Sequence, residues 1–289
     1  MKKSTPYILL LPALLFTVFV LVYPLAQNLV NSFSNASLIR GGASWVGLRN
    51  YGRIFGDSLF WLAFRNTAVY AVAGTLLSLL VGLGLALLLN LKIGRLTNIA
   101  AFLYTIPWVI SPVVAGFAWK WVLNDRFGIV NYWLASAGIV KLGTSWLGDP
   151  HMALLCVILA RVWQFYPFAM VMFLAGLQAI PQEQYEAAAV DGATMFRRFF
   201  NITLPNLRSV SSVLLVLGVI WSFNDFNMVF VMTRGGPMNS SMVLPVLVRE
   251  LSFVHFDLGA GSALSIITFV LLVCLSALYL KVVARGESA

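Results

Sequence analysis

Four residues between positions 161 and 168 have the side-chain types and the spacing of a ligand-binding helix face. They are Arg161, Gln164, Phe165 and Phe168. Their spacing of i, i+3, i+4 and i+7 places them on one side of an α-helix. Aromatic rings suit the C–H faces of a sugar, and guanidinium and amide groups can hydrogen-bond its hydroxyls. This face therefore predicts a site for a polyhydroxylated solute.

A second face with the same spacing follows later in the chain. It consists of Gly218, Trp221, Ser222 and Asp225, with Asn224 alongside. A helix rises 1.5 Å per residue, so Arg161 and Asp225 would lie at similar depths in their apolar stretches. We therefore expect the two faces to form one substrate-binding site.

Each of these residues also has a purely structural interpretation. Arg161 and Asp225 can neutralise one another as an ion pair, and the aromatic rings can simply fill space between helices. If Arg161 contacts the solute instead, its guanidinium predicts an acidic group, because it binds phosphate, sulfonate or carboxylate bidentately. Both interpretations stay open at this point.

The composition places these faces inside a membrane. Of 289 residues, 60% are hydrophobic and only 10% are charged, whereas a soluble domain has about 25% charged residues. The net charge of +9 fits basic loop ends facing anionic lipid headgroups. No basic stripe with interleaved aromatic residues is present, which argues against nucleic acid as a partner. His151 and His255 lie far apart without further ligands, which argues against a metal site.

Six apolar stretches are long enough to cross about 30 Å of hydrocarbon as helices. The predicted fold is therefore an all-α integral membrane protein, and in the second span we expect Gly74, Gly82 and Gly84 to allow close helix contact. The first stretch is longer than a signal-peptide core and is interpreted as an uncleaved anchor. Counting Lys and Arg in the loops does not decide the orientation. The expected spans are about 7–31, 65–90, 98–122, 152–178, 207–232 and 259–284.

The most polar stretch of the second half, Glu186–Pro205, lies between two of these spans. Its sequence is EAAAVDGATMFRRFFNITLP. The alanines favour a helix, and Gly192 provides a break before a second short helix over 195–202. Pro205 is expected to end that helix. Two short helices joined at a glycine predict a compact knob outside the bilayer.

This stretch resembles the cytoplasmic coupling loop of binding-protein-dependent ABC importer permeases. The resemblance rests on Glu-Ala-Ala at 186–188, Asp-Gly-Ala at 191–193 and Leu-Pro at 204–205. Three further phrases resemble carbohydrate-class, maltose-type permeases: 46–51 (VGLRNY), 124–131 (NDRFGIVN) and 233–237 (TRGGP).

The resemblance implies a type I ABC importer permease fold, with one transmembrane domain over residues 1–289 and a cytoplasmic coupling loop at 179–206. The protein would be a permease subunit for a sugar or sugar derivative and not itself an enzyme. It would hold no cofactor, since partner ATPase subunits would bind ATP and Mg. Phe199, Phe200, Ile202 and Leu204 would anchor the loop to the spans. The residues implied in ATPase coupling are Glu186, Ala187, Ala188, Asp191, Gly192, Ala193, Leu204 and Pro205.

The implied partners are a second, homologous permease chain in a heterodimer, two ATP-binding cassette subunits and an extracytoplasmic solute-binding protein. The implied location is the bacterial or archaeal cell inner membrane, with both termini cytoplasmic. Two alternatives remain: an importer of the same build for a non-sugar solute, and an ion-coupled secondary transporter. The second is disfavoured because Asp225 is the only acidic residue deep in a span. An intramembrane enzyme is disfavoured because the spans hold no paired carboxylates and no activated nucleophile.

Overall fold

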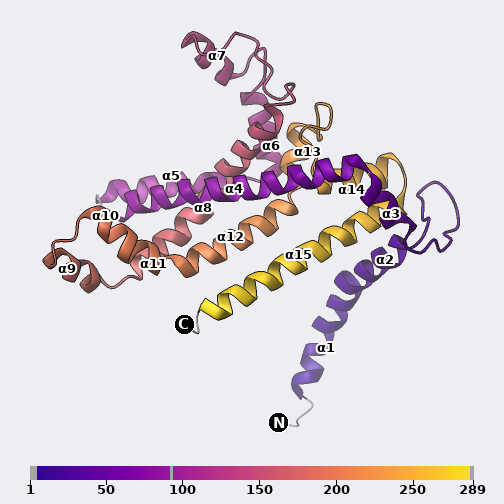
Figure 1. Ribbon diagram of the computed structural model, residues 1–289, viewed down its shortest axis with the longest axis horizontal. Helices are drawn as coiled ribbons and strands as arrows, with labels where there is room; N and C mark the ends of the chain where they lie inside the picture. The colour runs from indigo at the N-terminus through magenta and orange to yellow at the C-terminus, as the bar shows by residue number, and fades with distance from the viewer. Residues whose placement is uncertain (1–4, 92–93, 287–289) are drawn as a thin grey trace. The chain divides into compact units, whose positions relative to one another are not determined.

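A computed structural model describes residues 5–91 and 94–286, and every regular element within them is a helix (Figure 1). The all-α prediction is confirmed. Three short π-helical segments are η1 (Val18–Val22), η2 (Phe199–Thr203) and η3 (Glu250–Val254). The α-helices are α1 (Thr5–Thr17), α2 (Tyr23–Ser32), α3 (Arg49–Gly56), α4 (Ser58–Asn90), α5 (Arg95–Val109), α6 (Pro112–Val122), α7 (Ile129–Ser136), α8 (Ala153–Gln178), α9 (Gln182–Val190), α10 (Met195–Arg198), α11 (Leu204–Asn206), α12 (Arg208–Phe223), α13 (Asn227–Met232), α14 (Leu244–Arg249) and α15 (Leu258–Gly286).

Some helical stretches are long and apolar enough to cross a membrane by themselves, and others only as a bent pair. Four unbroken stretches qualify: Leu10–Ser32, Ser58–Asn90, Ala153–Gln178 and Leu258–Ala277. Two others qualify only as bent pairs: Thr97–Val109 with Pro112–Val122, and Met195–Asn206 with Arg208–Phe223. The described residues therefore hold four candidate spans, or six if each bent pair is one span.

The third expected span, 98–122, is not one straight helix. Its two halves, α5 and α6, meet at an angle of 99°. Ser111 precedes Pro112 and is extended, with φ −54° and ψ 137°. The ring of a proline disfavours helical geometry in the residue before it, and this explains where the helix breaks.

The fifth expected span, 207–232, is also broken. Helix α12 ends at Phe223, and α13 begins at Asn227. The Asn224 side chain donates to the carbonyl of Ile220 (3.0 Å), and the Asp225 carboxylate accepts from the backbone N–H of Met228 (3.2 Å). These two polar side chains satisfy the backbone on either side of the break. The expected span therefore contains a helix break that the sequence analysis did not mark, and its bounds stay a prediction.

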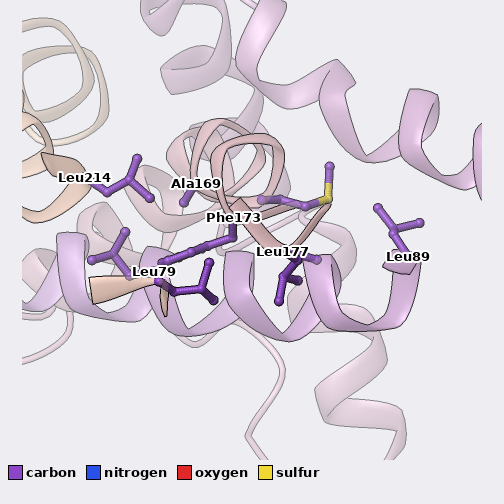
Figure 2. Close-up of a cluster of buried hydrophobic side chains, with 9 residues drawn as sticks. Leu79, Leu89, Ala169, Phe173, Leu177 and Leu214 are labelled. Atoms are coloured by element: carbon purple, nitrogen blue, oxygen red, sulfur yellow. The ribbon is translucent and has the colours of Figure 1, made fainter. Parts of the chain in front are cut away.

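The chain groups into two compact units, and the predicted single domain stays a prediction. The larger unit, Leu62–Val243 with Cys274–Ala289, contains a hydrophobic core formed by α4, α8 and α12 (Figure 2). Residues from all three helices meet there: Leu79, Ala86, Leu89, Ala169, Met170, Phe173, Leu177, Leu207 and Leu214. This core holds together the three helices that carry the candidate site.

The smaller unit comprises the described parts of Met1–Trp61 and Leu244–Val273. Within it, the buried Asn50 amide donates to the carbonyls of Ser32 and Ser34 (2.9 and 2.8 Å). Arg53 forms an ion pair with Asp257 (2.8 Å). Segments before the second span are thereby tied to the start of α15.

Candidate functional site

The two faces predicted from helical spacing meet in an aromatic cluster. The Trp221 ring on α12 lies 5.8 Å from the ring of Phe165 in an edge-on contact, and 5.3 Å from that of Phe168, measured between centroids. Phe165 and Phe168 on α8 are 5.8 Å apart. Trp108 on α5 extends the cluster, with its ring 5.3 Å from that of Phe168. Trp221 remains 41% exposed, so one of its surfaces is available for contact within the larger unit.

Gly218 allows α12 to approach the other two helices closely. A Cβ atom at this position would lie 2.5 Å from Thr75 Cγ2 and 3.0 Å from Phe165 Cε1. Both distances are shorter than a normal carbon–carbon contact. Gly218 therefore acts through its missing side chain, by bringing Thr75 on α4 and Phe165 on α8 against the α12 backbone.

Arg161 is buried at this site, with 9% of its surface exposed. Its guanidinium carbon lies 4.8 Å from the centre of the Phe165 ring, which is a cation–π contact. The Arg161 Nε and Nη2 atoms find no hydrogen-bond partner within the described chain. The positive charge is thus held against an aromatic ring while two of its donors stay unused.

Asp225 does not pair with Arg161. One Asp225 oxygen accepts from the Tyr70 hydroxyl (2.6 Å), and the other accepts from the Met228 N–H. The ion pairs of the described residues are Arg53–Asp257 and Arg249–Glu250. A direct Arg161–Asp225 ion pair is therefore not formed among the described residues.

The other predicted polar residues divide into two groups. Gln164 donates from Nε2 to the carbonyl of Ile110 at the α5–α6 break (3.1 Å), while its Oε1 is buried without a partner. The hydroxyl of Ser222 is likewise buried and has no partner among the described residues. Asn224 is exposed and caps α12. Its assignment to substrate stays a prediction, but its observed contact is structural.

Three residues of this region were missed by sequence reasoning: Tyr70, Thr75 and Trp108. Tyr70 and Thr75 lie on α4, which the sequence analysis considered only for its glycines. A signal was available, because small and polar residues recur every fourth position along one side of that helix. They are Asn66, Tyr70, Gly74, Ser78 and Gly82. Trp108 lies outside any such pattern.

The segment predicted to be a coupling loop, 179–206, has the expected two-helix form. Helix α9 ends at Val190, and Gly192 has a φ of +71°, a conformation that glycine adopts without strain. Helix α10 then starts after Thr194, whose hydroxyl accepts from the backbone N–H of Arg197 (3.4 Å). Glu186, Ala187 and Asp191 are exposed, and Ala188 and Ala193 are half-buried.

The attachment of this loop differs from the expectation in two ways. Pro205 does not end the helix, which continues through η2 and α11 to Asn206 and then bends by 62° into α12. Asn206 is the last helical residue before the bend, so the helix ends one residue beyond Pro205. The expected anchors Phe200 and Leu204 are 57% and 39% exposed. The described attachment includes the Tyr185–Thr203 hydrogen bond (2.9 Å) and the fully buried Leu207, and the anchoring role of Phe200 and Leu204 stays a prediction.

Known proteins similar to this chain are membrane components of transport systems. The family model described as "Binding-protein-dependent transport system inner membrane component" matches residues 78–286. The chain is 36% identical over 281 residues to the sulfoquinovosyl glycerol transport system permease protein SmoG of Agrobacterium fabrum, covering 97% of this chain and 90% of that protein. It is 35% identical over 280 residues to the trehalose/maltose transport system permease protein MalF of Thermococcus litoralis, covering 96% and 92%.

Solved structures agree on the fold. A chain of the bacterial alginate ABC transporter, crystallised with an alginate pentasaccharide-bound periplasmic protein, superposes with a TM-score of 0.83 at 20% identity. The match covers 96% of this chain and 93% of the other. The predicted resemblance to ABC importer permeases is confirmed. The chain belongs to the family of inner membrane components of binding-protein-dependent transport systems.

Proposed function

We propose that this permease subunit carries a sugar or sugar derivative across the membrane. The observation that supports this most is the aromatic cluster of Phe165, Phe168 and Trp221 beside buried polar groups inside membrane-length helices. Flat apolar rings next to hydrogen-bonding groups match a sugar, which has C–H faces and a rim of hydroxyls. The relatives that transport sulfoquinovosyl glycerol and trehalose or maltose, according to their names, support the same substrate class.

The proposal includes the rest of the importer. A solute-binding protein delivers substrate outside the membrane, and a second, homologous permease completes the pathway. Two ATPase subunits bind ATP and Mg, and they dock on the exposed coupling loop at α9, Gly192 and α10. Their closure moves the coupling loops together and switches the cavity between inward-facing and outward-facing states. In this arrangement the coupling loop and both termini are cytoplasmic.

Uptake by the complete importer tests this function. We expect uptake of a sugar to require ATP and to persist when ion gradients are collapsed. Trp221→Ala should raise the substrate concentration for half-maximal uptake by up to about 10-fold, since an aromatic contact contributes ~0.5–1.5 kcal/mol. Trp133→Ala is a matched control, because Trp133 lies on α7 and is 65% exposed. ATP-independent uptake, or selective uptake of amino acids over sugars, would contradict the proposal.

A further inference from the structure

Unpaired buried polar atoms concentrate at one place in this chain. Within the described residues, six buried side-chain atoms have no hydrogen-bond partner. Five of the six belong to Thr75, Arg161, Gln164 and Ser222, and only Ser240 lies elsewhere. Buried polar groups in proteins are nearly always hydrogen-bonded, so such a concentration requires an explanation.

These four residues surround the contact between Phe165 and Gly218. Arg161 lies over the Phe165 ring, and Gln164 precedes that residue on α8. Thr75 lies against Gly218, and Ser222 follows Gly218 by one turn of α12. The unpaired atoms therefore come from three helices that converge on one region.

The two unused nitrogens of Arg161 form a matched pair. In the planar guanidinium, Nε–H and one Nη2–H lie on the same edge and point in parallel directions. Both are buried and unpaired, whereas the face of the same group is covered by Phe165. Such an edge fits two oxygens of one carboxylate, sulfonate or phosphate group. Two adjacent hydroxyls of a neutral sugar can also span this edge, but they bring no negative charge to the guanidinium.

Arg161 also makes no direct ion pair among the described residues. Asp225 is engaged by Tyr70 and Met228 N–H, and Arg161 takes part in neither of the two ion pairs of the described residues. The cation–π contact with Phe165 leaves the N–H edge unsatisfied. Buried guanidinium donors without an acceptor are costly, and an anion bound at them lowers that cost.

We propose that the Nε/Nη2 edge of Arg161 binds an anionic group of the transported sugar derivative. This inference rests on the proposed function and specifies its substrate class as an acidic sugar or polyol derivative. The Gln164 Oε1 atom accepts hydrogen bonds from the neutral hydroxyls, and the hydroxyls of Thr75 and Ser222 donate to them or accept from them. The aromatic cluster contacts the apolar face of the same molecule.

The test uses the complete importer with substrates in pairs that differ only in charge. One pair is sulfoquinovosyl glycerol and glucosyl glycerol, and another is methyl glucuronide and methyl glucoside. ATP-dependent uptake is measured for the native protein and for Arg161→Gln, Arg161→Lys and Arg40→Gln. Arg40 is an exposed loop arginine, so its variant controls for loss of one positive charge.

We expect the native importer to prefer an anionic member over its neutral partner. Arg161→Gln should reduce anionic uptake about 100-fold, as for truncation of a buried charge pair, and neutral uptake far less. Arg161→Lys should recover only part of the loss, because an ammonium lacks the two-donor edge, and Arg40→Gln should behave as native.

Three results would overturn the inference. They are a native preference for the neutral members, an equal loss of both members in Arg161→Gln, and full anionic uptake in that variant. The native preference needs no variant, so misfolding of a substituted protein leaves the test intact. If the native importer takes up amino acids but no sugar of either charge, the sugar function itself fails, and the two failures are thereby distinguished.

Discussion

Gly82→Ala and Gly84→Ala are the same substitution two residues apart on α4, and the structure predicts opposite effects on stability. A Cβ atom on Gly82 would lie 2.8 Å from Ala169 Cβ, 2.9 Å from Met170 N and 3.0 Å from Tyr166 O. The last two atoms belong to the α8 backbone and cannot rotate away. A Cβ atom on Gly84 would meet nothing within 4 Å.

The magnitude follows from two opposing contributions. Alanine favours a helix over glycine by about 1 kcal/mol at either position. At Gly82, forcing α8 away adds an overpacking cost of about 1–3 kcal/mol. We therefore expect Gly84→Ala to be neutral or stabilising, and Gly82→Ala to be less stable than Gly84→Ala by about 1–3 kcal/mol.

Thermal unfolding of the two variants in the same detergent measures this difference. At roughly 2–4 °C per kcal/mol for chains of about this size, a difference of ~2 kcal/mol corresponds to a Tm about 4–8 °C lower for Gly82→Ala. Equal Tm values, or a lower value for Gly84→Ala, would refute the described contact between α4 and α8.

Two further substitutions test the proposed ATPase coupling and the anchoring of the 233–243 loop. Gly192→Val should abolish uptake and ATPase co-purification while leaving the subunit in the membrane, because valine is strained at a φ of +71°. Gly192→Asn should retain both, because asparagine tolerates that φ. Co-purification of the ATPase with the valine variant would contradict the coupling role. Asn66→Leu should destabilise the protein by about 1–3 kcal/mol, because the Asn66 amide donates to the carbonyls of Ser240 and Met242 (3.0 and 3.1 Å). Limited proteolysis should then cut the 233–243 loop faster, and an unchanged cleavage rate would count against that anchoring.

The membrane-length helices were largely predictable, but their breaks were not. The fourth span was expected at 152–178 and is α8, Ala153–Gln178, because a long apolar run with a single charged residue, Arg161, has few other solutions in a bilayer. Hydropathy reports apolarity and not backbone direction, so the 99° bend at Ile110–Ser111 was invisible to it. The Ser111-Pro112 pair carried the local signal for that break.

The candidate site was predictable where helical periodicity decides the geometry. Phe165, Phe168 and Trp221 were placed on two faces by spacing, and their rings meet in the structure; their contact with substrate stays a prediction. Side-chain contacts between different helices were not predictable, because the periodicity of one helix does not show which other helix lies opposite. The sequence analysis therefore considered Arg161 as the partner of the Asp225 carboxylate, whereas its partner is Tyr70 from α4.

Three glycines of the second span were expected to allow helix contact, and each has different surroundings in the structure. Gly82 meets the α8 backbone, Gly84 faces open space, and a Cβ on Gly74 would make only an ordinary 3.4 Å contact with Arg161 Cγ. Small residues in a membrane helix thus mark possible close approach, and the position of the neighbouring helix decides which one is used.

The bend between α5 and α6 has a consequence for the order of events during synthesis. The Ile110 carbonyl at the bend accepts its hydrogen bond from Gln164, which lies 54 residues further along the chain. At about 5–20 residues per second, the ribosome adds that glutamine roughly 3–11 s after Ile110. A backbone carbonyl without a partner in hydrocarbon costs several kcal/mol. We therefore expect the bend imposed by Pro112 to lack this hydrogen bond until α8 has been made and packs beside it.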